Sequence, residues 1–149
     1  QAQTLGVGVE VQVFGRISLA LSARCYHARA HDRVKDNCQF VCEESPDGME
    51  LDTVDGDAFL AVNGIQTLSH PYVNLMQEMP EMAQAGVSAF RLSPHDCDMV
   101  KVCRLFGGVS SGRLSPDEGI HGLQEAGIAA SFCNGFSHGV DGYRWVANS

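Results

Sequence analysis

The sequence predicts an α/β fold that forms part of a (β/α) barrel. A valine-rich strand pattern near the start of the chain is followed by further apolar strands that alternate with helix patterns, and this order is typical of α/β proteins. Glycine, proline and capping residues bound these helix patterns in the second half. A closed barrel takes about 250 residues, whereas this chain has 149. We therefore expect residues 1–149 to form a single incomplete α/β domain, a partial barrel.

Composition narrows the class of protein. Apolar residues make up 44% of the chain and charged residues 19%, which is typical of a globular domain. The formal net charge of -8 argues against a protein that binds nucleic-acid backbones. No apolar run approaches the roughly 18 to 20 residues of a membrane span. The chain begins without an initiator Met or a secretory leader, so we expect that its N-terminus is a cut.

The first half of the chain contains three predicted strands. Residues 6–14 alternate valines with other residues, which predicts a buried strand of an α/β sheet. Residues 49–54 and 57–62 are apolar or alternating and flank Asp55-Gly56. Since Asp-Gly favours the positive φ angles of a tight turn, the two runs predict a hairpin, with its second strand buried.

The second half contains helix signals at regular intervals. Pro80 opens a short helix that Gly86 ends, and a strand is expected at residues 87–92. Residues 93–106 start with Ser-Pro, an N-cap and first-turn pair, and predict a helix that the following glycine stops. Residues 115–127 start with a Ser-Pro-Asp-Glu capping box and predict a last helix ended by glycine.

Six cysteines are present, and three of them form a close group. Cys25, Cys38 and Cys42 are spaced Cys-x12-Cys-x3-Cys, and thiolates grouped in this way suit a soft metal centre, either zinc or an iron–sulfur cluster. A fourth ligand is missing from the group. An even number of cysteines is also compatible with disulfides in a secreted protein. The clustering and the ordinary core-forming composition favour a reduced protein of the cytoplasm.

Two of the other cysteines give weaker indications of a ligand role. Cys103 shares an apolar helical face with Val102 and Phe106, so we expect it to be buried in the core. Cys97 lies outside that pattern, and its spacing leaves a ligand role open.

Basic residues gather around the first cysteine of the group. Residues 16–35 contain five of the ten Lys and Arg, opposed only by Asp32. Such cations lower the pKa of nearby thiols and stabilise an anionic cluster or substrate, although a solvated loop is the alternative. We single out Arg16 and Arg24 as candidate contacts to an anion or substrate. The five residues are Arg16, Arg24, Arg29, Arg33 and Lys35.

Several segments resemble the collagenase-like "unclassified" peptidase family, number thirty-two. The segments are residues 10–16, 22–26, 35–42, 61–69, 90–94 and 133–135, which together extend over nearly the whole chain. Peptidase and transfer-RNA-hydroxylating members typically carry His-Gly after the first strand. Phe14-Gly15-Arg16 stands there instead, which favours the UbiV-like branch of the family.

The resemblance implies a cofactor and its ligands. In the UbiV-like branch four cysteines hold a [4Fe-4S] cluster, and three of them correspond to Cys25, Cys38 and Cys42. The fourth belongs to the N-terminal half of the family fold, so the chain resembles the C-terminal half of a TIM-barrel-like domain. Cys97, Cys133 or His27 could replace it, and no physical reason favours one of them.

The resemblance also implies a function. The chain would be the iron–sulfur subunit of an anaerobic, oxygen-independent system that hydroxylates a ubiquinone precursor. It would act in a heterodimer with a UbiU-like partner. The implied oxygen donor is prephenate, a dianion that would suit the cations Arg16 and Arg24.

Three alternatives remain at this point: a family protease, a prephenate-dependent RNA hydroxylation protein, and a structural zinc module. The sequence has no Gly-x-Ser-x-Gly elbow and no His-Glu-x-x-His helix. Cys25 and His27 could form a thiol–base pair, but residues two apart seldom meet in that way. The catalytic residues are therefore left unassigned.

Overall fold

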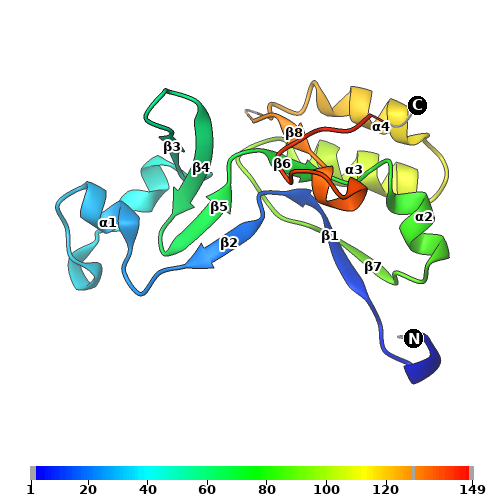
Figure 1. Cartoon of the computed structure of the whole chain (residues 1–149), viewed down its shortest axis with the longest axis horizontal. Coiled ribbons are helices and arrows are strands. Elements are labelled where there is room, and N and C mark those ends of the chain that lie inside the picture. Colours follow the sequence, from blue (N-terminus) through cyan, green and yellow to red (C-terminus); the bar gives the residue numbers. More distant parts are fainter. Residues whose placement is uncertain (1–2, 129, 148–149) are drawn as a thin grey trace. The chain divides into compact units, whose positions relative to one another are not determined.

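The computed structural model describes residues 3–128 and 130–147, without the side chains of Gln3 and Lys35 (Figure 1). The chain folds as two compact units. Unit 1 contains the chain up to Gly15 and again from Tyr72 onward, and unit 2 contains Arg16–Pro71. Unit 2 is therefore an insertion between the first two strands of unit 1. Each unit has a four-stranded sheet of its own.

The sheet of unit 1 is mixed, with the strand order β7-β1-β6-β8. Its strands are β1 (Glu10–Gly15), β6 (Tyr72–Asn74), β7 (Ala89–Leu92) and β8 (Phe132–Cys133). β1 is parallel to β7, β6 is parallel to β8, and the central pair β1 and β6 is antiparallel. The carboxyl ends of β6 and β8 consequently lie at one edge of this sheet, opposite to those of β1 and β7.

Helices pack on this sheet and complete the core of unit 1. They are α2 (Met79–Gln84), α3 (Met99–Ser110) and α4 (Pro116–Leu123), with short 3-10 turns η1 (Gln3–Leu5) and η4 (Gly135–His138). Phe14 lies fully buried at the centre. Its ring makes edge contacts with Phe106 and Tyr72, at centroid distances of 5.5 and 5.8 Å. The rings join β1, β6 and α3.

The predicted bounds of α3 were wrong at both ends. The helix begins at Met99 because Asp98 caps it, accepting a hydrogen bond from the Lys101 N–H at 2.9 Å. It continues past Gly107 to Ser110. Gly108 is needed for close packing, since a Cβ there would lie 2.6 Å from Leu114 Cδ1. Tertiary packing thus outweighs the glycine stop signal.

The capping box of α4 is confirmed. Ser115 Oγ accepts from the Glu118 N–H, and Glu118 Oε2 accepts from the Ser115 N–H at 2.8 Å. These bonds from the Ser115 backbone and side chain lower the pKa of Glu118. The strand predicted at residues 87–92 and the helix that starts around Pro80 are also present, as β7 and α2.

Unit 2 is an antiparallel sheet with helical turns in one connection. Its order is β2-β5-β4-β3, with β2 (Ser18–Leu21), β3 (Met49–Asp52), β4 (Ala58–Asn63) and β5 (Gln66–Ser69). The connection from β2 to β3 contains α1 (Tyr26–Ala30), η2 (Lys35–Asn37) and η3 (Val41–Glu44). The predicted hairpin is confirmed as β3 and β4, but its loop is longer than the predicted Asp55-Gly56 turn and spans residues 53–57. The prediction that its second strand is buried was only partly right, since Ala61 and Val62 are buried but Phe59 is 58% exposed.

The α/β class predicted from the sequence is confirmed. Both sheets are open over the described residues, and a partial barrel stays a prediction. Within that part of the chain, no helix combines the length and the apolar character needed to cross a membrane.

Candidate functional site

The three cysteines singled out from their spacing all belong to one connection of unit 2, between β2 and β3. Cys25 is the N-cap of α1, and its Sγ accepts from the Ala28 N–H at 3.5 Å. Cys38 directly follows η2, and Cys42 lies within η3. All three thiols are unpaired and half-buried. Cys25 and Cys38 therefore lie at the ends of two short helical segments, and Cys42 lies within the third.

The backbone between Cys38 and Cys42 is strained. Gln39 and Phe40 both have positive φ values, of 52° and 54°. A residue with a Cβ costs about 1 to 2 kcal/mol in this left-handed region, and such strain clusters at functional sites. The Arg33 guanidinium supports the loop, donating to the Cys38 carbonyl at 3.2 Å and to Gln39 Oε1 at 2.7 Å. Sequence reasoning had treated Arg33 only as one charge in a basic stretch.

The thiols fit a soft metal chemically, but their arrangement is not a closed ligand set. Free, half-buried cysteines are suitable ligands of zinc or iron. Over the ranges 3–128 and 130–147, no three or more His, Cys, Asp or Glu side chains come together in a way that could hold a metal ion. Cys25, Cys38 and Cys42 share one connection of unit 2 without forming a preorganised site.

His27 is fully buried beside this group. Its Nδ1 accepts from the Gly64 N–H at 3.0 Å, and its Nε2 is buried without a partner among the described residues. Burial, with a smaller effect of His31, lowers the pKa of His27. The imidazole is therefore neutral with its proton on Nε2. Nδ1 already accepts from Gly64. His27 therefore does not act as a base for Cys25 and has no free lone pair to offer a metal.

The two candidate arginines differ in their surroundings. The Arg16 side chain is buried and donates to the carbonyls of Ser69 and His70. Its Nη2 lies 3.8 Å from Glu50 Oε1, and His70 Nε2 lies 3.3 Å from the same oxygen. Arg24 is exposed. Arg16 thus has a structural role within unit 2, and contact of either residue with a substrate stays a prediction.

The remaining cysteines lie in unit 1. Cys133 is buried, and burial raises its pKa to about 11, so it stays a protonated thiol. Cys97 is half-buried with its Sγ 3.6 Å from Met99 Sδ. The prediction that Cys103 is buried was wrong, because α3 turns Val102 and Phe106 inward and leaves Cys103 exposed.

A buried polar cluster in unit 1 escaped the sequence analysis. Glu78 Oε1 accepts from Asn134 Nδ2 and lies 2.8 Å from His138 Nε2. Glu78 and Asn134 are buried, with exposures of 8% and 2%. Glu78 and His138 are 60 residues apart in the sequence, so no local pattern joins them. In the sequence, the only sign of this cluster is Asn134, a polar residue directly after a short apolar strand.

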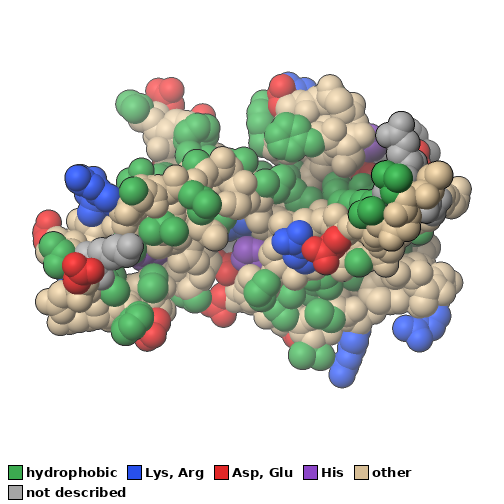
Figure 2. Space-filling view, turned by 90° about the horizontal axis from the view of Figure 1, so that it is seen from below, with side chains coloured by type: hydrophobic (Ala, Val, Ile, Leu, Met, Phe, Trp, Pro, Cys, Tyr) green, Lys and Arg blue, Asp and Glu red, His purple; other side chains and the backbone are tan. Residues whose placement is uncertain are grey.

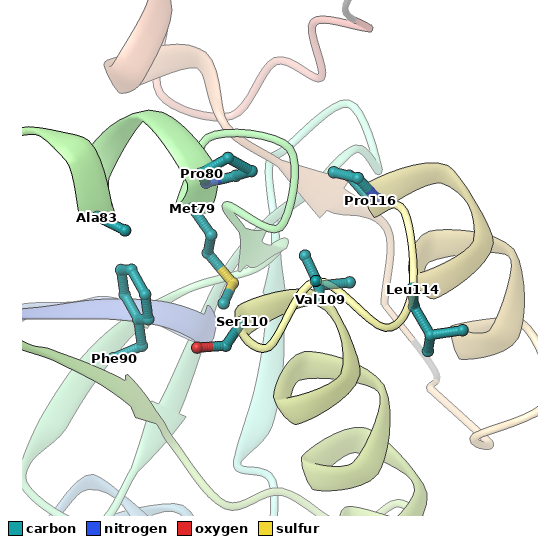
Figure 3. Close-up of a pocket in the computed structure, with 9 residues that line it drawn as sticks. Met79, Pro80, Ala83, Phe90, Val109, Ser110, Leu114 and Pro116 are labelled. Carbon is teal, nitrogen blue, oxygen red and sulfur yellow. The ribbon is translucent and has the colours of Figure 1, made fainter.

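Unit 1 also contains an apolar pocket of about 270 Å³ between α2, β7 and the α3–α4 turn (Figure 3). Its lining residues are Met79, Pro80, Ala83, Phe90, Val109, Ser110, Gly112, Leu114 and Pro116. The Ser110 hydroxyl is the polar side-chain group among them. Because none of these side chains titrates, the pocket can bind apolar groups but supplies no acid, base or metal ligand.

Apolar side chains also reach the surface in both units, and Figure 2 shows several on the face that it draws. In unit 2 they include Leu21 and Phe59, which are 71% and 58% exposed. In unit 1 they include the rings of Phe136, Tyr143 and Trp145. The last three belong to the same C-terminal segment as Asn134 and His138.

The comparison with protein families decides the family. The family model for peptidase family U32 matches residues 1–107. The chain belongs to peptidase family U32. The matched part of this U32 protein includes Cys25, Cys38, Cys42 and Glu78, whereas Asn134 and the other residues after 107 lie beyond it. No solved structure matches the chain.

Proposed function

We propose that this U32 protein is the iron–sulfur subunit of an oxygen-independent hydroxylation system in ubiquinone biosynthesis, acting with a UbiU-like partner. The observation that supports the proposal best is the Cys-x12-Cys-x3-Cys group inside the family match. Its three thiols are unpaired and lie on one connection of unit 2. This is the ligand spacing that the UbiV-like resemblance implies for a [4Fe-4S] cluster.

The fourth ligand is part of the proposal. Cys133 is a poor candidate because its raised pKa, about 11, keeps it protonated, and the thiolate is the form that binds metal. His27 is a poor candidate because Gly64 occupies its Nδ1. We therefore assign the fourth ligand to the N-terminal half that the resemblance implies, with Cys97 as the alternative within this chain.

The strained loop between Cys38 and Cys42 supports the proposal that these two cysteines are ligands of one centre. Left-handed residues between two ligands bring the chain around sharply, and an arginine hydrogen bond holds the turn. The thiols lie at short helical turns rather than on a sheet, so we expect closure of the ligand set to rearrange this connection and to leave the sheet in place. Arg24, which is exposed, is the better of the two candidate contacts for prephenate.

The alternatives have less support. A thiol protease needs a base for its cysteine, and His27 uses Nδ1 to accept from Gly64. A structural zinc module would use the same three thiols, and metal analysis separates it from the cluster. RNA hydroxylation with prephenate would suit a less acidic protein, since the net charge here is -8.

An anaerobic hydroxylation assay tests the proposal. The protein is combined with a UbiU-like partner, a ubiquinone precursor and prephenate, and the hydroxylated product is measured by mass spectrometry. Cys38→Ser is expected to abolish product formation, whereas the matched control Cys103→Ser removes an exposed thiol and keeps it. Full product formation by Cys38→Ser would contradict the proposal.

A further inference from the structure

The cluster of Glu78, Asn134 and His138 has the geometry of an acid–base pair. Glu78 is the N-cap of α2, yet its carboxylate makes no capping bond to that helix. It turns instead toward the carboxyl ends of β6 and β8. There Oε1 lies 2.8 Å from both Asn134 Nδ2 and His138 Nε2. A buried carboxylate that orients an imidazole is the arrangement that prepares histidine for proton transfer.

The hydrogen bonds of Asn134 assign the tautomer of His138. Asn134 Nδ2 has two hydrogens, and it donates them to Glu78 Oε1 and to the Val146 carbonyl, both at 2.8 Å. It has none left for His138, 3.2 Å away. The bond between His138 and Glu78 therefore uses a proton on Nε2. In the described part of the chain Nδ1 has no hydrogen-bond partner, and 24% of the side chain remains exposed.

Buried polar atoms beside the pair lack partners. Glu78 Oε2 and Gln77 Oε1 are buried acceptors without a hydrogen bond among the described residues, and Asn74 Nδ2 is a buried donor in the same state. An unpaired buried group of this kind destabilises the folded protein, and more so when it is charged. Asn74 is the last residue of β6, and Gln77 and Glu78 follow it. The carboxyl ends of strands are where α/β sheets bind ligands.

Aromatic rings border the same segment. Phe136 and Tyr143 are 70% and 67% exposed, and Trp145 is 37% exposed. The segment is held together, since the Asn134 and Gly135 N–H groups both donate to the Arg144 carbonyl at 3.0 Å. It is the orange-to-red end of the chain in Figure 1. Exposed rings favour stacking with a flat aromatic ligand.

We infer that Glu78, Asn134 and His138 form an acid–base site for the hydroxyl group of a small aromatic ligand, a phenol. The phenol O–H bond breaks, its electron pair stays on oxygen as phenolate, and the proton binds His138 Nδ1. Glu78 keeps its bond to the Nε2–H and balances the imidazolium charge. For the natural ligand, a quinone precursor with a ring hydroxyl, the inference rests on the proposed function. The site itself needs no metal.

Binding of 4-nitrophenol to the metal-free protein tests this inference, because its anion is yellow and its neutral form is not. At a slightly acidic pH, wild-type protein is expected to raise the yellow phenolate band until it saturates. His138→Gln should weaken that response by about tenfold or more, the change that corresponds to loss of one charge-assisted bond. His121→Gln, which removes an exposed histidine of α4, should leave it unchanged.

A measurement on the wild-type protein covers the case in which His138→Gln does not fold. Nitrogen-15 NMR of the imidazoles should find His138 protonated on Nε2 alone, with its Nδ1 signal shifting on addition of 4-nitrophenol. A wild-type protein that yields no saturable phenolate band, or an unmoved Nδ1 signal, would overturn the inference. Failure of the proposed function leaves both readouts unaffected, because neither requires a cluster or a partner.

Discussion

Replacing Asn134 by Ala should destabilise unit 1 strongly. The Asn134 side chain accepts from the Val146 N–H at 2.7 Å and donates to the Val146 carbonyl and to Glu78, each at 2.8 Å. Asn134 is only 2% exposed, so water cannot replace these hydrogen bonds unless the surrounding structure rearranges. Three bonds at about 1 kcal/mol each give a loss of about 3 kcal/mol in the free energy of unfolding. For a protein of this size the melting temperature should fall by roughly 6 to 12 °C.

Fluorescence of Trp145 is the assay of choice. It is the single tryptophan of the chain and precedes Val146, so it reports on the segment that Asn134 holds. Asn63→Ala is the matched control, because Asn63 makes one exposed hydrogen bond, to the Pro46 carbonyl at 2.9 Å in unit 2. It should change the Trp145 transition by less than about 1 kcal/mol. An equally small change for Asn134→Ala would refute the reasoning.

Three further predictions concern other residues. Because the pKa of His27 is lowered in the folded protein, the unfolded chain takes up the imidazole proton more readily, and the free energy of unfolding should fall as the pH drops below about 6.5. Urea titrations at several pH values should show a weaker dependence of this free energy on pH for His27→Gln. An unaltered pH dependence would count against a neutral buried imidazole. A thiol reagent should label the exposed Cys103 first and Cys133, with its pKa of about 11, only on unfolding, as mass spectrometry of timed samples would reveal; early labelling of Cys133 would contradict its burial. Arg33→Ala removes the donor to the Cys38 carbonyl and should raise the alkylation rate of Cys38 severalfold, whereas an unchanged rate would show that Arg33 does not hold the loop.

The sequence predicted features that depend on neighbouring residues. The hairpin at Asp55-Gly56 needs one glycine with positive φ, and Gly56 has a φ of 88°. The capping box of Ser115 likewise depends on residues three apart. Cys25, Cys38 and Cys42 belong to one connection because they are close in the sequence, and their role as ligands stays a prediction. Local chemistry is sufficient for such features.

Features that depend on tertiary packing could not be predicted from the sequence. The start of α3 is decided by Asp98 rather than by Ser-Pro at residue 93, and the face that it buries leaves Cys103 exposed. The bond between Glu78 and His138 joins residues 60 apart. The insertion of unit 2 between β1 and β6 was missed as well, since the residues that pair these strands, Phe14 and Asn74, lie far apart in the chain.

Metal analysis of anaerobically purified protein tests the central claim most directly. Iron, sulfide and zinc are measured with a visible spectrum, for the wild-type protein and for the variant in which Cys25, Cys38 and Cys42 are all Ser. When the fourth ligand is supplied by the N-terminal half that the resemblance implies, the proposal predicts a brown wild-type protein with about four irons per chain. It predicts a colourless triple variant without iron. A colourless wild-type protein with stoichiometric zinc, or a triple variant that keeps its iron, would contradict it.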